Sequence, residues 1–379
     1  MELATYRYLP RSGWDCPLDA TLDSASTLLL IFGASDTTAL LAGFDELRAA
    51  FPNSVWIGCS SAGEIHNRSL EDNSLVVAAV KFTNSRLMLT THGIQDAADS
   101  NTAGSQLAAR LNAPDLKAVF VLSDGLSVNG SELVKALSSG LSDNVVVSGG
   151  LAGDGDRFQQ TWVLIDQRPV PQYVTAVGIY GANARVAHGS KGGWDVLGPE
   201  RTVTHAVGNV LYSLDGRPAL ELYEQYLGDR SSGMPATGLL FPLAIRNETE
   251  DGEPTVRTIL AIDRAANSIT FAGDIPRGSL VRLMHANFDR LIDGAANAAE
   301  QVSLGDYQDG PLLAIAVSCV GRRLVLGQRT EEEIDAVLDS LPTGCALVGY
   351  YSYGELSPMA SGRCELKNQT MTLSLIWEQ

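Results

Sequence analysis

The chain has 379 residues, enough for two domains of roughly 150–200 residues each, and 45% of them are hydrophobic. It carries 27 basic and 44 acidic residues, a formal net charge of −17. A field of that sign repels phosphate backbones and anionic lipid, so we expect neither nucleic acid nor a membrane surface as a partner.

The cysteines and the N-terminal segment indicate a reducing compartment. The five cysteines are widely spaced and include no CxxC pair, which is typical of intracellular proteins. The first residues show no basic segment followed by an apolar run, so a secretory signal is not predicted. No apolar stretch is as long as a membrane span. We therefore expect a cytoplasmic protein.

The first half of the chain alternates short apolar runs with helical patterns. Residues 28–32 and 54–58 form continuous apolar runs, as expected of strands covered on both faces, and 38–51 has the spacing of a helix. The remaining elements expected in this half are strands at 74–82, 85–93, 117–122, 144–147, 161–165 and 174–180, and a helix at 130–141. This order predicts a mainly parallel or mixed sheet with helices packed against it.

The second half opens with a turn at 215–218 that leads into a helix. Residues 283–299 read as a long amphipathic helix, and 330–341 as a helix with Thr330 as N-cap and Glu333 three residues later. The strands expected in this half are 241–245, 258–262, 268–271, 312–318, 346–350 and 371–377. The fold class predicted for the chain is α/β: two related domains of mixed sheets flanked by helices, with internally duplicated βαβ units.

A Gly–acidic turn recurs after strands in both halves. Gly58–Ile65 and Gly349–Leu356 both read G-x-x-S-x-G-E followed by an aliphatic residue, and Gly149–Asp154 is a looser copy. Because ligands of open α/β sheets gather at the carboxyl ends of strands, these turns are candidates for lining a pocket. The candidate residues are Cys59, Ser60, Gly63, Glu64, Gly153, Asp154, Tyr353, Gly354 and Glu355. In the alternative interpretation, the glycines only permit positive φ and the acids form local caps or pairs.

Several motifs together resemble a known family. They are Ile57–Ile65 (IGCSSAGEI), Ser148–Phe158 (SGGLAGDGDRF), Val203–Tyr223 with LDGRPALELY, Met284–Ala296, Ser318–Arg322 (SCVGR) and Gly349–Pro358 (GYYSYGELSP). In this order they resemble the FIST proteins, in which a FIST N-terminal domain precedes a FIST_C domain. The resemblance implies an N-terminal extension over 1–24, a FIST domain over 25–216, a FIST_C domain over 217–360 and a final strand within 361–379 that completes the sheet.

The resemblance also implies a function. FIST proteins sense small ligands in signal transduction, and one stand-alone bacterial branch is similar in consisting of these two domains only. That branch binds haem b, responds to nitric oxide and regulates a histidine kinase. We expect a sensor rather than an enzyme, whose ligand is a small molecule or gas and whose output passes to a separately encoded histidine kinase or phosphorelay protein.

A haem would need an axial ligand at the mouth of an apolar slot. His188, in a glycine-rich segment with Trp194, is the first candidate to bind the iron, and His285, on the helix expected at 283–299, is the second. Arg185 and Lys191 are candidates for contacting the propionates, or are ordinary solvated charges.

Two other functions stay open. In the first, a haem-free protein binds an amino-acid-like metabolite through charge pairing, for which Arg257, Asp263 and the acids of the turns are candidates. In the second, Cys59 is the nucleophile of an enzyme, activated by helix N-terminal amides. The chain shows neither a dinucleotide fingerprint nor a P-loop, and no histidine pair has zinc-site spacing.

Overall fold

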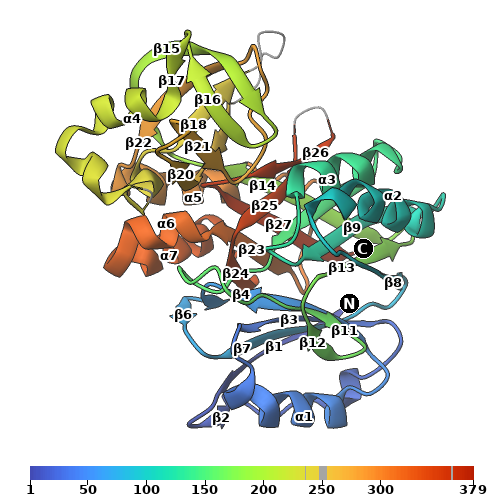
Figure 1. The fold of residues 1–379 in the computed structure, drawn as a ribbon. Coiled ribbons are helices and arrows are strands. Elements are labelled where there is room, and N and C mark those ends of the chain that lie inside the picture. The colour runs from blue at the N-terminus through green and yellow to red at the C-terminus, as the bar shows by residue number, and fades with distance from the viewer. Residues whose placement is uncertain (235, 247–253, 360–361) are drawn as a thin grey trace.

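The computed structural model describes residues 1–234, 236–246, 254–359 and 362–379 (Figure 1). Three mixed sheets form the body of the molecule, and a fourth, antiparallel sheet stands on one end of it. Short 3₁₀ helices connect several elements: η1 (Ala20–Leu22), η2 (Thr38–Leu40), η3 (Ala97–Asp99), η4 (Gly228–Gly233), η5 (Ala236–Leu240) and η6 (Gly327–Arg329). No helix in the described ranges is long and apolar enough to cross a membrane.

Sheet 1 is the bottom layer in Figure 1 and has the strand order β12-β11-β4-β3-β7-β1-β2. Its strands are β1 (Glu2–Leu9), β2 (Gly13–Trp14), β3 (Thr27–Ala34), β4 (Val55–Ser61), β7 (Leu75–Lys81), β11 (Val163–Ile165) and β12 (Arg168–Val170). Helix α1 (Leu41–Ala50) covers its outer face, where Phe44 and Leu47 are buried.

Sheet 2 has the order β26-β25-β10-β9-β13-β8. Its strands are β8 (Arg86–Gly93), β9 (Leu116–Ser123), β10 (Val146–Leu151), β13 (Tyr173–Tyr180), β25 (Gly354–Pro358) and β26 (Cys364–Lys367). Helices α2 (Ser100–Leu111) and α3 (Gly130–Ser139) pack on its outer face.

Sheet 3 has the order β14-β27-β23-β24-β5-β6. Its strands are β5 (Glu64–His66), β6 (Ser69–Glu71), β14 (Ala184–Lys191), β23 (Leu313–Cys319), β24 (Ala346–Ser352) and β27 (Met371–Glu378). Helices α5 (Phe288–Glu300), α6 (Val320–Leu326) and α7 (Thr330–Ser340) lie on its outer side.

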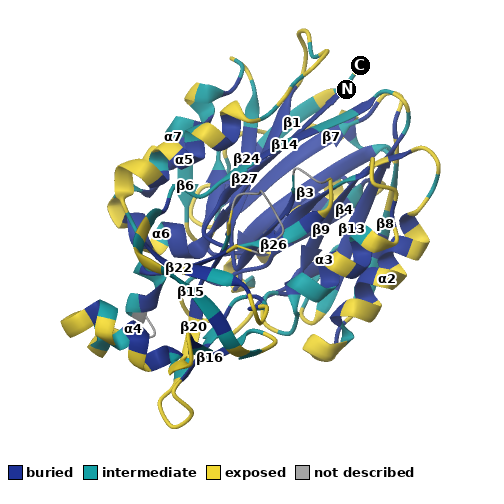
Figure 2. Cartoon of the chain, turned by 90° about the horizontal axis from the view of Figure 1, so that it is seen from above, coloured by how far each residue is buried: buried dark blue, intermediate teal, exposed yellow. Residues whose placement is uncertain are grey.

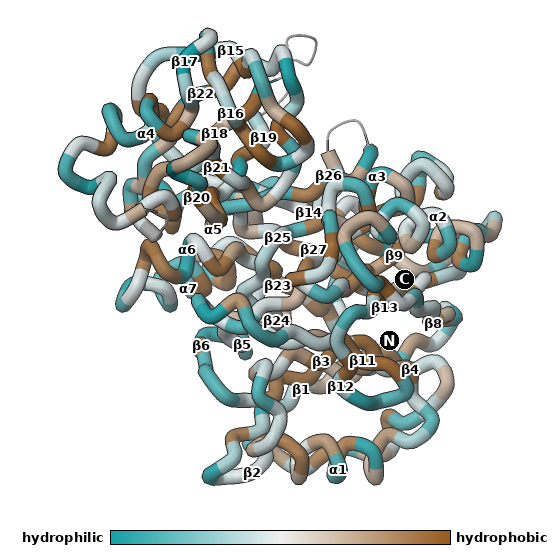
Figure 3. Tube along the Cα trace, in the orientation of Figure 1, coloured by the Kyte–Doolittle hydropathy of each residue, from teal (hydrophilic) through white to brown (hydrophobic). Residues whose placement is uncertain are grey.

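The inner faces of sheets 1, 2 and 3 share one core. Along β3, Leu28, Leu30 and Phe32 enter this core, while Leu29 and Ile31 pack outward toward α1. The strands of sheets 2 and 3 alternate in the same way between the shared core and their own helices. Figures 2 and 3 show the result: the strands are buried and largely hydrophobic, and exposed residues gather on the helices and loops. Burial on both faces explains the continuous apolar runs of the sequence.

Each of these sheets is built around the same unit, so the βαβ unit is present three times. In each unit two parallel strands, β3 and β4, β9 and β10, or β23 and β24, are followed by an antiparallel strand that pairs with the first of them. Gly58, Gly149 and Gly349 are equivalent: a Cβ at each would lie 2.3, 1.9 and 2.1 Å from the carbonyl oxygen of Ile31, Val121 and Ala316 respectively. The second strand of each pair therefore needs glycine at this position.

The three units exchange the short strands that follow their second parallel strand. The β5–β6 hairpin of the first unit pairs with β24 of the third, β11–β12 of the second pairs with β4 of the first, and β25–β26 of the third pairs with β10 of the second. The exchange closes a ring of three units. The two chain ends also meet, because the Met1 amino group lies 3.5 Å from Glu378 Oε2.

The fourth sheet is an insertion in the third unit, between β14 and α5, and is called the inserted sheet below. It is antiparallel, in the order β19-β18-β22-β15-β16-β21-β20, with β17 paired to β16. Its strands are β15 (Asp195–Val207), β16 (Val210–Leu214), β17 (Arg217–Pro218), β18 (Leu243–Arg246), β19 (Thr255–Arg257), β20 (Ile259–Asp263), β21 (Ser268–Phe271) and β22 (Leu280–His285). With α4 (Ala219–Leu227) it forms a hydrophobic core of its own.

The α/β class and the repeated units are confirmed, but the helix expected at 283–299 is wrong at its start. Residues up to His285 belong to β22, and α5 begins at Phe288. The Asn287 side chain accepts a hydrogen bond from the Arg290 N–H, so this cap fixes the helix start. Thr330 is not an N-cap either, because its hydroxyl bonds back to the Gly327 carbonyl.

Candidate functional site

The three Gly–acidic turns meet at the centre of the ring. The Ala62 N–H donates to the Tyr351 carbonyl (2.8 Å), Gly153 N–H to the Ser60 carbonyl (3.0 Å), and Tyr353 N–H to the Leu151 carbonyl (3.3 Å). Each bond links one unit to the next, so the three bonds follow the hairpin exchange around the ring. Turns separated by nearly 300 residues therefore form one structure at the carboxyl ends of the parallel strands.

Glu64 and Glu355 are equivalent buried acids beside this ring. Glu64 Oε2 accepts hydrogen bonds from the Ser74 N–H and hydroxyl (3.1 and 2.9 Å), and Glu355 Oε2 accepts the same pair from Thr370 (3.1 and 2.8 Å). Burial, only partly opposed by these hydrogen bonds, raises the pKa of Glu64 to about 8 and that of Glu355 to about 7. Both acids hold chain segments together, as the alternative interpretation of the turns expected.

Asp154 is not the third copy of these glutamates. The position of the second unit that corresponds to Glu64 and Glu355 lies one residue after Asp154. The carboxylate of Asp154 accepts hydrogen bonds from the backbone N–H groups of residues 158, 159 and 160 and from the Tyr353 hydroxyl. Burial alone would raise the pKa of Asp154, but these donors hold it below its usual value. The aromatic ring of Tyr353 also stacks on that of Phe158, and the two ring centroids are 4.4 Å apart.

A cavity of ≈ 330 Å³ lies between the ring of turns and the inserted sheet, and we call it the junction cavity. The ends of β9, β10, β23 and β24 form one wall, and β20 and β21 with their flanking loops form the other. Its apolar lining residues are Leu126, Val128, Leu151, Phe158, Leu239, Leu260, Phe271 and Val320. Its polar lining residues include Asn129, Asn209, Thr258, Asp274, Cys319 and Tyr353. A mainly apolar cavity with a few polar groups is the usual form of a small-molecule site.

Two polar groups that line this cavity, on Thr258 and Cys319, indicate what it can bind. Thr258 is 5% exposed, and its hydroxyl oxygen has no hydrogen-bond partner among the described residues. Cys319 is the last residue of β23, and burial, with the nearby charge of Glu355, raises the pKa of its thiol. The thiol is therefore protonated at neutral pH and is a weak donor rather than a nucleophile. The cavity is suited to binding, with a free hydroxyl available to a ligand.

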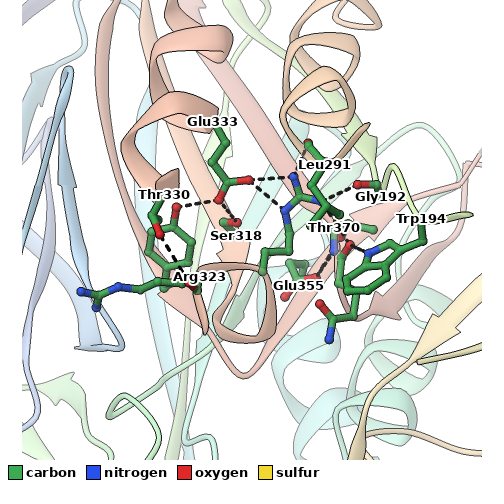
Figure 4. Close-up of polar contacts among 12 residues, drawn as sticks. Gly192, Trp194, Leu291, Ser318, Arg323, Thr330, Glu333, Glu355 and Thr370 are labelled. Carbon is green, nitrogen blue, oxygen red and sulfur yellow. Dashed lines mark hydrogen bonds and ion pairs between the residues drawn. The ribbon is translucent and has the colours of Figure 1, made fainter. Parts of the chain in front are cut away.

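A buried ion pair involves Arg322, which directly follows the cavity-lining residues of α6 in the chain, and Figure 4 shows its polar contacts. Arg322 and Glu333 are both fully buried, with Arg322 Nη2 and Nε 2.7 and 3.0 Å from Glu333 Oε2. The other carboxylate oxygen of Glu333 accepts hydrogen bonds from the Tyr351 and Ser318 hydroxyls (2.6 and 3.2 Å). Arg322 also donates to the carbonyls of Leu291 and Gly192. Strands β23 and β24, helices α5, α6 and α7 and the segment after β14 are thus tied to one point.

The residues expected around a haem are not brought together. His188 lies on β14, half-buried, on the face of sheet 3 that looks into the shared core with Val186. Burial and the charge of Lys367 lower the pKa of His188, so it is neutral at pH 7. Arg185 and Lys191 are odd-numbered positions of the same strand and therefore point to the opposite face. They cannot meet the propionates of a haem held by His188.

Trp194 and His285 are also apart from His188. The Trp194 ring is buried against the start of the inserted sheet, and its Nε1–H donates to the Gln369 carbonyl (2.9 Å). His285 ends β22 opposite Asp195. No histidine lines the junction cavity, and no group of three or more His, Cys, Asp or Glu among the described residues is placed to hold a metal ion. The residues expected to hold a haem, His188, Arg185, Lys191, Trp194 and His285, therefore do not form one slot in this structure.

Cys59 lies inside the shared core. It is fully buried within β4, opposite Val163, and burial raises the pKa of its thiol. Because it precedes no helix, the amide activation considered for it is not available. Helix α2, the Arg322–Glu333 pair and the free hydroxyl of Thr258 were not predicted from the sequence. The SCVGR motif was the one signal that pointed to Arg322.

Comparison with known proteins agrees with this geometry. The FIST N domain model matches residues 27–217, and the FIST C domain model matches residues 219–358. No curated protein gives a significant match. A solved cyanuric acid hydrolase from A. caulinodans is similar over 77% of this chain and 99% of its own, at 12% identity and a TM-score of 0.17. So low a score supports no conclusion about this chain.

The mixed sheets and the repeated units define an α/β protein with a cavity between the body and the inserted sheet. Since the two domain models cover residues 27–217 and 219–358, the chain belongs to the FIST family. FIST domains are associated with signal transduction through the sensing of small ligands.

Proposed function

We propose that the chain is a non-enzymatic signal-input protein that binds a small, mostly apolar metabolite in the junction cavity. The observation that carries this proposal is the position of the cavity, whose walls come from two separately packed bodies, the ring of units and the inserted sheet. A ligand that touches both walls stabilises the arrangement in which both contacts are made. The shifted arrangement is the signal, and it passes to a separately encoded histidine kinase or phosphorelay protein.

The polar groups of the cavity set the ligand class. One free hydroxyl, Thr258, and the protonated thiol of Cys319 suit a neutral group such as a carbonyl or hydroxyl, while Phe271 and Leu260 suit an apolar body. The volume of ≈ 330 Å³ is at the lower end of the usual range for ligand sites, roughly 300–1,000 Å³. The haem-based nitric oxide sensor implied by the family resemblance is the alternative, and the fit of the residues around His188 does not favour it.

A thermal-shift screen of amino acids and small neutral metabolites tests the proposal. A specific ligand raises the melting temperature of the wild type by mass action. Leu126→Trp places a large ring in the cavity from a half-exposed position and should weaken binding more than tenfold. Leu41→Trp, on exposed α1, is the matched control and should respond as the wild type does. If no compound raises the melting temperature, or if both variants respond alike, the junction cavity is not the ligand site.

Haemin separates the alternative from the proposal. We expect no Soret band from a bound haem after haemin is added and the excess is removed. A stoichiometric Soret band that is lost in His188→Ala and kept in the control His92→Ala would show that the ligand is haem b and not the proposed metabolite.

A further inference from the structure

A second cavity, of ≈ 360 Å³, opens beside the junction cavity, and we call it the α3 crevice. Helix α3 forms one side, β26 another, and β18 and β19 of the inserted sheet close it. Asp274 lines both cavities, and the Asn129 amide donates to its carboxylate (3.4 Å). The crevice is a distinct site, because its side chains are charged and the wall of the junction cavity is mainly apolar.

Arg257 is the central group of this crevice. It is 8% exposed, and its hydrogen bonds to described residues all go to carbonyl oxygens: Leu366 at 2.9 Å, Asp274 at 3.3 Å and Val256 at 3.4 Å. Among the described residues, no carboxylate lies within ion-pair distance of it. Burial lowers its pKa to about 10, and the carboxylates of Glu365, Asp274 and Glu355 offset this only from a distance. A buried guanidinium is normally paired with an oxyanion, and the described residues supply none to Arg257.

Helix α3 adds free donors on the facing side. Ser131 and Ser138 both line the crevice, and the oxygen of each hydroxyl is buried with no hydrogen-bond partner among the described residues. Residues seven apart lie two turns apart on the same face of a helix, so both hydroxyls are presented together. Arg363, exposed at the rim, supplies a second guanidinium.

We propose that the α3 crevice binds the oxyanion group, carboxylate or phosphate, of a small metabolite. Arg257 and one of the two hydroxyls contact the anion, while the other hydroxyl, about 10.5 Å away along the helix, is available to a second polar group of the metabolite. Glu365 and Asp274 also line the crevice, so they disfavour ligands with several negative charges. The site is independent of the ligand proposed for the junction cavity.

The full-length protein is titrated with inorganic phosphate and, separately, with acetate, each against sodium chloride of equal ionic strength. Melting temperature and binding heat are the readouts. We expect at least one of the two anions to bind. Binding of phosphate alone identifies a phosphate ligand, and binding of acetate alone identifies a carboxylate ligand. Binding of both identifies a site that accepts either group. If neither acts beyond the chloride control, the proposal is overturned.

Variants then assign the anion to the crevice. Arg257→Lys keeps the charge but loses the planar fork, and should weaken binding roughly tenfold. The Ser131→Ala/Ser138→Ala protein should bind the anion about three- to tenfold more weakly, and it keeps the test open if Arg257→Lys fails to fold. The controls are Ser142→Ala, an exposed serine just after α3 that does not line the crevice, and Arg264→Gln, an exposed arginine of the inserted sheet. A folded double-serine variant that binds like Ser142→Ala contradicts the assignment, whereas Leu126→Trp should leave anion binding unchanged.

Discussion

At the scale of single residues, Glu64 and Glu355 are the least expected feature, because both carboxyl groups are buried and neither forms an ion pair with a described residue. Each fixes the turn before a core strand through a pair of hydrogen bonds from one serine or threonine. The burial that raises their pKa values leaves Glu64 mostly protonated and Glu355 partly protonated at pH 7 in the folded state, although an exposed glutamate would have lost its proton.

This proton makes stability depend on pH. The folded-state pKa of Glu64 rises from 4.5 to about 8, so the folded protein binds more protons than the unfolded chain in this window. The free energy of unfolding therefore falls as pH rises from about 5 to 8, by up to roughly 1.4 kcal/mol for each pH unit per group. Urea unfolding at pH 5.5 and 8 should show a smaller decrease for Glu64→Gln and Glu355→Gln than for the wild type. Exposed Glu46→Gln is the control and should keep the full decrease.

At the scale of elements, α6 and α7 are held on sheet 3 by Arg322 and Glu333. Their side chains are fully buried, so the pair has lost all its hydration and depends on its hydrogen bonds to the Leu291 carbonyl, Tyr351 and Ser318. Removing one partner leaves the other charge buried and uncompensated.

We expect Glu333→Gln or Arg322→Met to lower the free energy of unfolding by about 3–5 kcal/mol. The double variant Arg322→Met/Glu333→Leu should recover much of that loss, since no charge stays buried. Arg329, which bonds exposed Glu332 on the neighbouring helix surface, provides the control: Arg329→Met should change stability by less than about 1 kcal/mol. Urea unfolding measures all four proteins. Equal losses for Arg322→Met and Arg329→Met would show that the buried pair is not what holds the helices.

At the scale of the whole molecule, the exchanged hairpins make parts of the chain depend on one another, whereas the insertion is largely self-contained. The hairpins make the three units depend on one another, since each sheet is completed by strands of the next unit. The inserted sheet instead has its own core, and its first and last paired residues, Asp195 and His285, lie side by side. A short linker can therefore join the two ends of the body.

We expect a protein in which residues 195–285 are replaced by a short Gly–Ser linker to keep the circular dichroism and cooperative unfolding of the body. It should lose the thermal shift given by any junction-cavity ligand, because one wall of that cavity is gone. Its melting temperature should fall somewhat, since Leu291 and Leu326 lose apolar contacts with Ala244 and Met284. Non-cooperative unfolding of this protein would show that the ring needs the inserted sheet.

Local pattern was sufficient for much of the fold. The runs at 28–32 and 54–58 predicted strands buried on both faces, because only such strands can be apolar at every position. The repeated glycine turns predicted repeated units, because a carbonyl oxygen of the neighbouring parallel strand leaves no room for a Cβ at Gly58 or Gly349. The boundary near residue 285 was missed because Leu280–His285 fits a helix or a strand equally well over so short a run.

The sequence by itself determined the class of the protein: its periodicity, glycine spacing and motifs are local properties, and they specify buried strands, helices and the FIST family. Only the tertiary structure decided which strands exchange between units, that Arg322 meets Glu333, and that among the described residues the Thr258 hydroxyl has no hydrogen-bond partner and Arg257 meets no carboxylate. These features depend on contacts between segments far apart in the chain. Periodicity states which face of a strand or helix is buried, but not what it is buried against.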